Sequence, residues 1–378
     1  MLQKEARPAA QTMSETTNNA EAATGSGKPK QKRNRKLARF GIVFALLGLV
    51  LFAYFVKKAD PWLILSGLQR LGWGFLLIIA ISGVRQTARS LAWLRCFEPP
   101  HGLRFRDAFA ARVMGDALGN IIPLASVAVA EPSKAAFVAH RVPLMAGLSA
   151  LALENIFYSL SVALVIFSGT TALLFSFSLP KPLRYASIIA MMVTLIIAPV
   201  GYFVLRRQWK FLSRPMSLLG GWGIARTWIT ERGIPRAQTL ENRIYGFYAR
   251  NSNRLISIFL LEVCFHLAGI TEIYVTLYFI SSVPPTLLTA FILESVNRVI
   301  NVVFKFIPLR TGIDEAGTGM LAKVLGFTTA VGVTLAIVRK ARDIFWASIG
   351  VALMVRRGLT LRNLEKINEG QVKLVEPA

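Results

Sequence analysis

Long apolar segments separated by short polar ones run through most of the chain, a pattern typical of a helical membrane protein. A hydrocarbon core of about 30 Å needs roughly 20 helical residues to cross it. Residues 62–71 are too few for a crossing and contain Trp62, which favours a short helix at the membrane surface. The segments that fit full crossings are residues 40–57, 72–97, 143–167, 183–206, 255–282 and 328–355.

Two further apolar stretches, residues 107–140 and 284–326, are interrupted by proline. Pro123 and Pro308 each lie in an Ile-Pro-Leu triplet. Proline in a helix interior removes a backbone hydrogen bond and clashes with the preceding turn, so each stretch is predicted to break there. The second helix of each stretch is expected to start near Glu131-Pro132 and near Asp314-Glu315.

Charge and hydropathy together exclude most soluble classes. The chain has 44 Lys and Arg against 20 Asp and Glu, a net charge of +24, yet 54% of it is hydrophobic and its mean hydropathy is +0.50. Much of the basic excess lies in a polar N-terminal tail (1–39), expected to be disordered, a loop (206–254) and a C-terminal tail (357–378). The positive-inside rule places all three, and therefore both termini, in the cytoplasm. There they would attract anionic lipid headgroups; nucleic acid is not an expected partner, because no recognition module accompanies them.

With these sides assigned, residues 107–140 begin and end inside, whereas residues 284–326 begin and end outside. The expected fold is therefore all-α and polytopic, with about six full transmembrane helices and two re-entrant broken hairpins. Residues 154–164 and 342–353 add a similar aromatic and aliphatic block after each hairpin. This order indicates an inverted repeat, typical of transporters, with halves of about 107–167 and 284–355 in a membrane domain of 40–356. Chance similarity between apolar segments is the alternative.

Ionisable residues inside apolar segments are costly, so they are candidates for function. Arg112, Asp116 and Asn120 follow one helix face before the first break, and Glu294 and Arg298 begin a similar face before the second. Arg112–Asp116 and Glu294–Arg298 have the spacing of ion pairs within one helix. The two residues of such a pair could serve only to neutralise each other. Alternatively, the pairs could line a cavity for a lipid headgroup.

The candidate headgroup-binding set combines arginine, which matches phosphate, with carboxylates, which hold ammonium or hydroxyl groups or relay protons. Glu131, Asp314 and Glu315 could instead cap helix N-termini. Glu154 is expected to face Arg339 or Arg342 across the repeat. The full set is Arg112, Asp116, Asn120, Glu131, Lys134, Glu154, Arg298, Asn301, Asp314, Glu315, Arg339 and Arg342, with Pro123 and Pro308 as the helix breaks.

The roles of some ionisable residues stay open. Arg85 and Arg89 could hold a lipid phosphate or extend to the membrane surface, while Glu262 and Glu272 receive no role. No nucleotide-binding or hydrolase motif is present, so no cofactor, metal or catalytic residue is expected.

The chain resembles the lysylphosphatidylglycerol synthase transmembrane-region family, whose flippase-like members include hopanoid-associated proteins. The resemblance covers about residues 40–356 and is carried by two acids, Glu131 and Glu154, and by three segments: Asn120-Ile-Ile-Pro-Leu, Phe306 to Glu315 and Gly332 to Arg339. It implies a bacterial inner-membrane protein that moves a phospholipid, an aminoacylated lipid or a hopanoid-type lipid between leaflets. The soluble synthase domain of fused relatives does not follow here, so synthase activity is not expected. A membrane scaffold for lipid-biosynthesis enzymes and an enzyme acting on lipid headgroups are the alternative functions.

Overall fold

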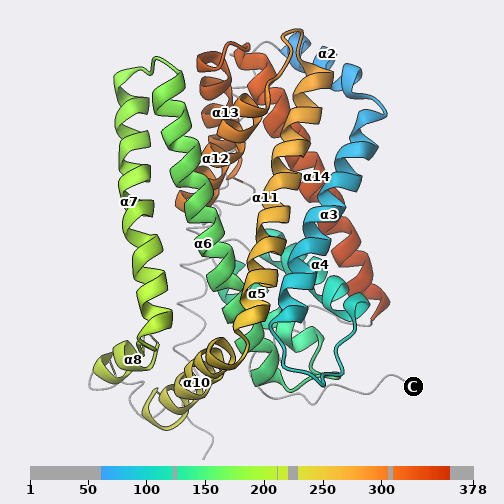
Figure 1. The fold of residues 1–378 in the computed structure, drawn as a ribbon. Coiled ribbons are helices and arrows are strands. Elements are labelled where there is room, and N and C mark those ends of the chain that lie inside the picture. The colour runs from blue at the N-terminus through green and yellow to red at the C-terminus, as the bar shows by residue number, and fades with distance from the viewer. Residues whose placement is uncertain (1–60, 122–125, 211, 220–228, 305–309, 358–378) are drawn as a thin grey trace, which may run out of the picture. The chain divides into compact units, whose positions relative to one another are not determined.

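A computed structural model describes residues 61–121, 126–210, 212–219, 229–304 and 310–357, all within the unit Phe44–Ala378. The regular elements of these residues are all helices (Figure 1). The predictions for residues 1–39, for the span 40–57, for Pro123 and Pro308 and for the tail after Arg357 lie outside the described residues. The helices are α2 (Pro61–Leu71), α3 (Gly74–Arg95), α4 (Phe105–Ile121), α5 (Ser126–Phe137), α6 (Leu144–Ser176), α7 (Lys181–Arg206), α8 (Ser213–Leu219), η1 (Ile229–Gly233), α10 (Ile234–Arg250), α11 (Ser252–Ile280), α12 (Leu287–Val303), α13 (Ile313–Val324) and α14 (Thr329–Arg356).

Four of the described helices are long and apolar enough to cross a membrane: α3, α6, α7 over Lys181–Gly201 and α11 over Asn253–Ile280. This confirms an all-helical membrane protein. The helix α14 has a comparable length of 28 residues but carries several charged side chains in its middle. Six full crossings stay a prediction.

The helix pairs α4–α5 and α12–α13 lie toward opposite ends of the bundle (Figure 1). The helix α13 begins at Ile313, so Asp314 and Glu315 lie in its first turn as expected. The other predicted start is wrong: α5 begins at Ser126 and runs through Glu131 and Pro132. Proline in a helix interior costs one hydrogen bond and crowds the preceding turn, and α5 accommodates both at Pro132.

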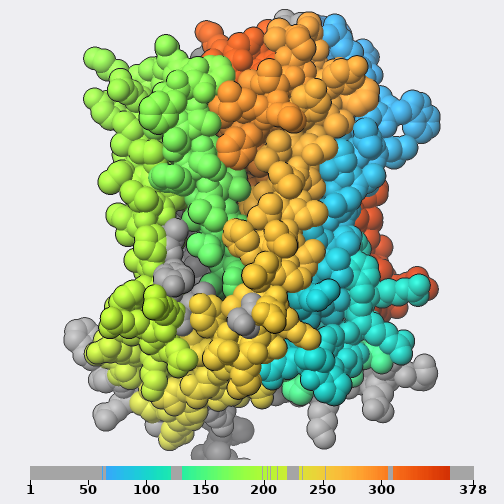
Figure 2. Space-filling model, in the orientation of Figure 1, coloured from blue at the N-terminus to red at the C-terminus, as the bar shows by residue number. Residues whose placement is uncertain are grey.

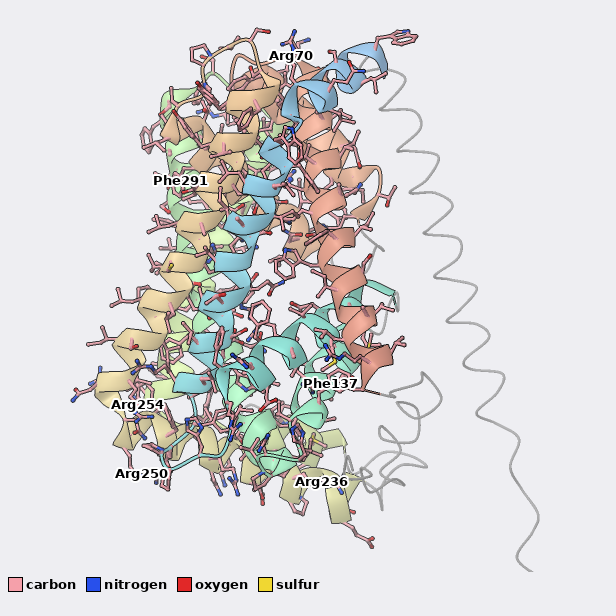
Figure 3. All side chains as sticks on the ribbon, turned by 90° about the vertical axis from the view of Figure 1, so that its right-hand side faces the viewer. Arg70, Phe137, Arg236, Arg250, Arg254 and Phe291 are labelled. Carbon is pink, nitrogen blue, oxygen red and sulfur yellow. The ribbon has the colours of Figure 1, made fainter. Side chains whose placement is uncertain are left out.

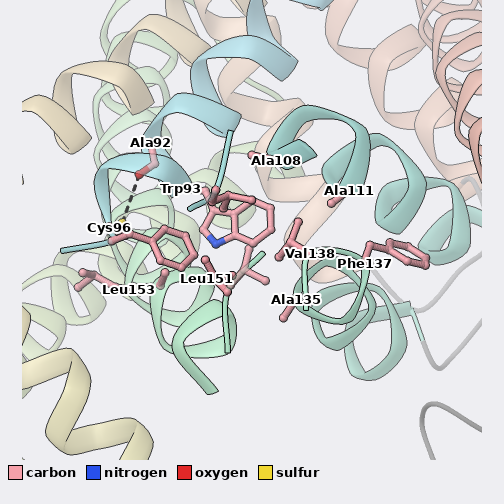
Figure 4. Close-up of a cluster of buried hydrophobic side chains, with 14 of the residues drawn as sticks. Ala92, Trp93, Cys96, Ala108, Ala111, Ala135, Phe137, Val138, Leu151 and Leu153 are labelled. Atoms are coloured by element: carbon pink, nitrogen blue, oxygen red, sulfur yellow. Dashed lines mark hydrogen bonds between the residues drawn. The ribbon is translucent and has the colours of Figure 1, made fainter. Parts of the chain in front are cut away.

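Two apolar cores hold these pairs in place. The first surrounds Trp93 at the end of α3 and is filled by small residues of α4 and α5, including Ala108, Ala111 and Ala135 (Figure 4). The second joins α2, α11, α12, α13 and α14 around Leu293. Each broken pair is thus packed into a core of its own.

The helix α14 reaches both pairs through glycine. A Cβ atom at Gly332 would lie 2.5 Å from the carbonyl oxygen of Thr318 in α13, and one at Gly350 would lie 2.5 Å from that of Val113 in α4. Backbone contacts this close exclude any larger side chain. One helix therefore connects the two ends of the bundle.

The described residues of the basic region, 206–210, 212–219 and 229–254, are largely helical. The Glu241 carboxylate of α10 accepts hydrogen bonds from the backbone amides of Leu212 (2.7 Å) and Ser213 (3.1 Å), which fixes the start of α8. Figure 3 shows Arg236, Arg250 and Arg254 together at one end of the bundle. The basic surface is therefore a structured part of the protein.

Candidate functional site

Charged side chains from α3, α4, α5, α6, α11, α12, α13 and α14 meet inside the bundle in a connected set of ion pairs and ring contacts, here called the polar seam. Cations and carboxylates take part in equal numbers among the described residues, so the seam is close to neutral. The cations are Arg85, Arg89, Arg112, Lys134, Arg298, Arg310, Arg339, Lys340 and Arg342; the carboxylates are Asp116, Glu131, Glu154, Glu262, Glu272, Glu294, Asp314, Glu315 and Asp343.

Glu154 is the centre of the first part of the seam. Its Oε1 atom accepts hydrogen bonds from Arg89 Nε and Arg112 Nη2, both at 2.9 Å. Arg112 also donates to the backbone carbonyl of Arg89 at 3.2 Å. Arg112 and Glu154 are both fully buried. One carboxylate oxygen on α6 therefore ties α3 to α4.

A second group extends this part toward the outside of the bundle. Lys134 Nζ lies 2.8 Å from both Asp116 Oδ1 and Glu131 Oε1. The Lys134 side chain is 2% exposed, whereas those of Asp116 and Glu131 are 37% and 30% exposed. The Asn155 amide connects this group to the first, since it donates to Glu131 Oε2 at 3.1 Å and accepts from Arg89 at 3.3 Å. The accessible part of this group is acidic.

The middle of the seam lies between α3, α11, α12 and α14. Glu272 of α11 binds Arg85 at 2.9 Å through one oxygen and Arg342 through the other. Glu294 and Arg298 form an ion pair within α12, and Arg85 approaches Glu294 at 3.8 Å. Four helices are thus held by alternating charges.

Aromatic rings join the first and middle parts. The guanidinium groups of Arg85, Arg298 and Arg89 lie 4.6, 5.0 and 5.7 Å from the centre of the Phe265 ring. The Arg89 guanidinium also lies 3.9 Å above the Tyr158 ring. Cation–π attraction of this kind stabilises arginine where water is excluded.

The last part of the seam contains α13 and α14. Arg339 donates to Thr318 Oγ1 at 2.6 Å and lies 4.0 Å from Asp314. Glu315 accepts a 2.7 Å bond from the Gly312 amide and pairs with Lys340. Glu315 therefore caps α13 and binds a cation at the same time.

An apolar cavity of about 640 Å³ lies beside the first part of the seam. Its walls come from α6, α7, α10 and α11 and include Phe157, Leu160, Ile197 and Phe259. The surface is hollowed between α6 and α7 (Figure 2). Asn155 lines this cavity and is also part of the polar seam. The apolar cavity and the polar seam therefore share one side chain.

Some buried polar atoms of the seam have no hydrogen-bond partner among the described residues. They include Nε and Nη1 of Arg112, the same two atoms of Arg339, Oε2 of Glu154 and both oxygens of Glu262. Such atoms are rare in folded proteins and indicate ligand, water or proton sites. Within the described ranges, no group of three or more His, Cys, Asp or Glu side chains is arranged to hold a metal ion.

Comparison with known proteins assigns the family. The family model described as "Lysylphosphatidylglycerol synthase TM region" matches residues 38–350. The chain belongs to this family. The lysylphosphatidylglycerol synthase TM region is thus a lipid-related membrane domain, as the resemblance implied. No curated protein and no solved structure gave a significant match.

In this lysylphosphatidylglycerol synthase TM region, the structure brings most of the predicted site residues into the seam. The Glu294–Arg298 pair is confirmed. Asn120 and Asn301 do not join the ion pairs of the described residues. Glu131 does not cap a helix N-terminus, because it lies in the middle of α5 and pairs with Lys134.

Two predicted pairings are wrong. Arg112 and Asp116 do not pair; Arg112 turns to Glu154, and Asp116 to Lys134. Glu154 does not meet Arg339 or Arg342, because the arginines of α3 and α4 already occupy it. Helix spacing shows which residues share a face, but it does not show which neighbouring helix that face meets.

Seven seam residues were missed or left open: Arg85, Arg89, Glu262, Glu272, Arg310, Lys340 and Asp343. Arg85 and Arg89 do not extend to the membrane surface; they are bound to carboxylates of α6, α11 and α12. The sequence held one signal for these contacts: α3 carries two basic residues and α11 two acidic ones. Charges of opposite sign in two apolar helices favour pairing between those helices.

Proposed function

We propose that this protein moves a lipid with a polar headgroup between the two leaflets of the membrane and leaves it chemically unchanged. The observation that carries the proposal is the meeting of the apolar cavity and the polar seam at Asn155. A lipid has the same two parts, an apolar tail and a polar head. A protein that only anchors itself in the bilayer needs neither the cavity nor the seam.

The cavity suits the tail. Its volume of about 640 Å³ lies within the range of about 300–1,000 Å³ that is usual for small-molecule pockets. The walls are almost entirely aliphatic and aromatic, and the helices α6 and α7 that border the hollow are lined with exposed apolar side chains. A lipid could therefore reach the cavity sideways from the bilayer.

The seam suits the headgroup. Two nitrogen atoms of Arg112 have no partner within the described ranges, and they match phosphate oxygens. Glu131 and Asp116 are partly exposed and match hydroxyl or ammonium groups. Several ions in the seam touch more than one opposite charge, so a headgroup can replace one partner while another remains. The exchange therefore avoids the cost of about 3–5 kcal/mol that arises when a buried charge loses its partner.

The arrangement of α4–α5 and α12–α13 at opposite ends supports the inverted repeat as part of the same proposal. The two pairs would form re-entrant hairpins from opposite faces of a bacterial inner membrane. Both termini and the basic helix α10 would then face the cytoplasm, where anionic headgroups and lipid-biosynthesis enzymes are the expected partners.

The test uses purified protein in proteoliposomes that contain a fluorescent phospholipid, with membrane-impermeant quenching of the outer leaflet. Arg112→Met and Asn155→Leu should slow flipping about 10–150-fold, the equivalent of one lost hydrogen bond to a charged group. Arg236→Met and Asn242→Leu are the matched controls, because both residues are exposed on α10. Wild-type rates in both seam variants would contradict the proposal.

A further inference from the structure

Glu262 is a buried acid that the predicted site does not include. It lies in the middle of α11 and is fully buried. Neither of its carboxylate oxygens has a hydrogen-bond donor among the described residues. The nearest cation is Arg89, whose Nε atom lies 3.9 Å from Glu262 Oε2, too far for a hydrogen bond.

Glu262 has no hydrogen bond from Arg89 because Glu154 competes for the same guanidinium group. The Nε and Nη2 atoms of Arg89 lie 2.9 and 2.8 Å from Glu154 Oε1, and Arg112 donates to the same oxygen. Glu154 therefore has two arginines, while Glu262 has none at bonding distance. In the part of the chain that the structure describes, Glu154 Oε2 lacks a donor as well.

The two acids are neighbours, because the Nε atom of Arg89 lies 2.9 Å from Glu154 Oε1 and 3.9 Å from Glu262 Oε2. When ionised, both carboxylates can only accept hydrogen bonds, so neither can donate to the other. One proton bound to the pair would supply the donor that it lacks. A buried carboxylate without a donor is costly, and such a group takes up a proton instead. A proton on Glu262 removes that charge and supplies the missing donor to Glu154.

Other charged groups near α11 do not replace that proton. On α12, Glu294 and Arg298 pair with each other near His266, and on α14, Arg342 binds Glu272. On α10, Glu241 caps α8, and on α2, Arg70 is exposed. The titratable and charged groups that act on Glu262 directly are Arg89 and Cys96 of α3, Arg112 of α4 and Glu154 of α6.

We propose that Glu262 is a proton-binding site that couples proton movement to the movement of a phosphate-bearing headgroup, a role that rests on the proposed function. With the proton bound, Arg89, Arg112 and Glu154 carry one net positive charge. That charge and the free nitrogen atoms of Arg112 match one phosphodiester anion. Glu262 is one helical turn from Phe259 in the cavity wall, so the lipid and the proton occupy neighbouring positions.

When the phosphate leaves, Arg89 can neutralise Glu262 instead. A shift of about 1 Å brings its Nε atom from 3.9 Å to a normal hydrogen-bond distance. The carboxyl group then becomes a carboxylate and its proton goes to water. A proton and a phosphodiester anion that travel together carry no net charge, which avoids about 2.3 kcal/mol of electrical work per 100 mV.

Infrared spectroscopy of the full chain in proteoliposomes tests the proton directly. The wild-type protein at neutral pH should show the carbonyl stretch of a protonated carboxyl group in an apolar site. Glu262→Gln should lose this band, and Glu98→Gln, an exposed acid at one end of the bundle, should keep it. A band that is absent from the wild type or retained in Glu262→Gln would overturn the proposal.

A second variant keeps the test decisive if Glu262→Gln does not fold. In Glu154→Gln, Arg89 is released from a carboxylate and the new amide can donate to Glu262. Glu262 should then ionise, so the band should again disappear. If Glu154→Gln folds and the band stays, the proton is not on Glu262.

Transport separates this proposal from the proposed function. Flipping of phosphatidylglycerol by the wild type should slow as the pH rises above neutral, by up to about tenfold per pH unit for one coupled proton, and Glu262→Gln should lose this dependence. A pH dependence that survives in folded Glu262→Gln overturns the coupling. Absence of any flipping, together with a carboxyl band lost in Glu262→Gln, would instead refute the proposed function and leave the proton site standing.

Discussion

Glu154→Ala should strongly destabilise the protein, because one oxygen of this carboxylate holds the buried Arg112 and the partly buried Arg89. Arg112 is fully buried, and Glu154 is its only carboxylate partner among the described residues. Removing one partner of a buried ion pair costs about 3–5 kcal/mol, since the remaining charge has no water to solvate it. Arg89 keeps a second acid within reach, Glu262 at 3.9 Å, so the loss should lie near the lower limit.

Reversible unfolding of detergent-solubilised protein by sodium dodecyl sulfate measures this loss. A cost of about 3 kcal/mol changes the unfolding equilibrium constant by more than a hundredfold. The matched control is Glu98→Ala, because Glu98 pairs with Arg250 at one end of the bundle and their side chains are 47% and 65% exposed. Exposed pairs of this kind contribute about 0–1 kcal/mol.

A double variant separates the ion pairs from simple packing. Arg112→Met removes the buried cation, so Glu154→Ala together with Arg112→Met should cost less than the sum of the two single changes. If Glu154→Ala costs no more than Glu98→Ala, the reasoning on buried charge is refuted.

Three further predictions concern packing, topology and pH. Gly332→Leu should separate α14 from α13 and cost about 1–3 kcal/mol, measured by the same unfolding; an unchanged stability would contradict the close contact. Introduced cysteines at Arg141 and Lys323, exposed residues that follow α5 and end α13, should react with impermeant maleimide from opposite sides of the membrane; labelling from one side would refute the inverted repeat. Burial and the neighbouring Glu241 raise the pKa of Tyr245 in α10 to about 12, so the stabilisation that Tyr245 gives is present below about pH 10 and is lost as the pH rises through 12. Phenolate absorbance should show one tyrosine that titrates near pH 12 in the wild type and not in Tyr245→Phe, and identical titrations of the two proteins would contradict this prediction.

Several helices could be predicted because apolar length is a local property of the sequence. The predicted span 255–282 became α11, and the start of α13 at Asp314 and Glu315 was also found. The predicted restart at Glu131 failed because a proline after an acid marks a helix start only as a tendency. In α5, Pro132 lies inside the helix.

Much of the composition of the site could be predicted, but of its connections only the Glu294–Arg298 pair within one helix was found. Arg112, Glu131, Lys134 and Glu154 were all candidates, because charge inside apolar helices is costly wherever it lies. Their pairing depends on how each helix is rotated against its neighbours, and Arg89 on α3 shows the difficulty. Its partner Glu154 is 65 residues away in sequence, and no local periodicity relates the two.

The length of α6 has a consequence for where the bilayer ends. Its 33 residues give a helix of about 50 Å, against a hydrocarbon thickness of about 30 Å. Tilts of up to about 40° do not absorb that excess, so part of α6 must stand outside the hydrocarbon. The helix α7 is shorter, and α6 packs against α10 as well. If the excess lies at the end of α6 that packs against α10, the edge of the hydrocarbon core comes close to Glu154. A lipid headgroup would then meet Arg89 and Arg112 while it is still in the headgroup layer of its leaflet.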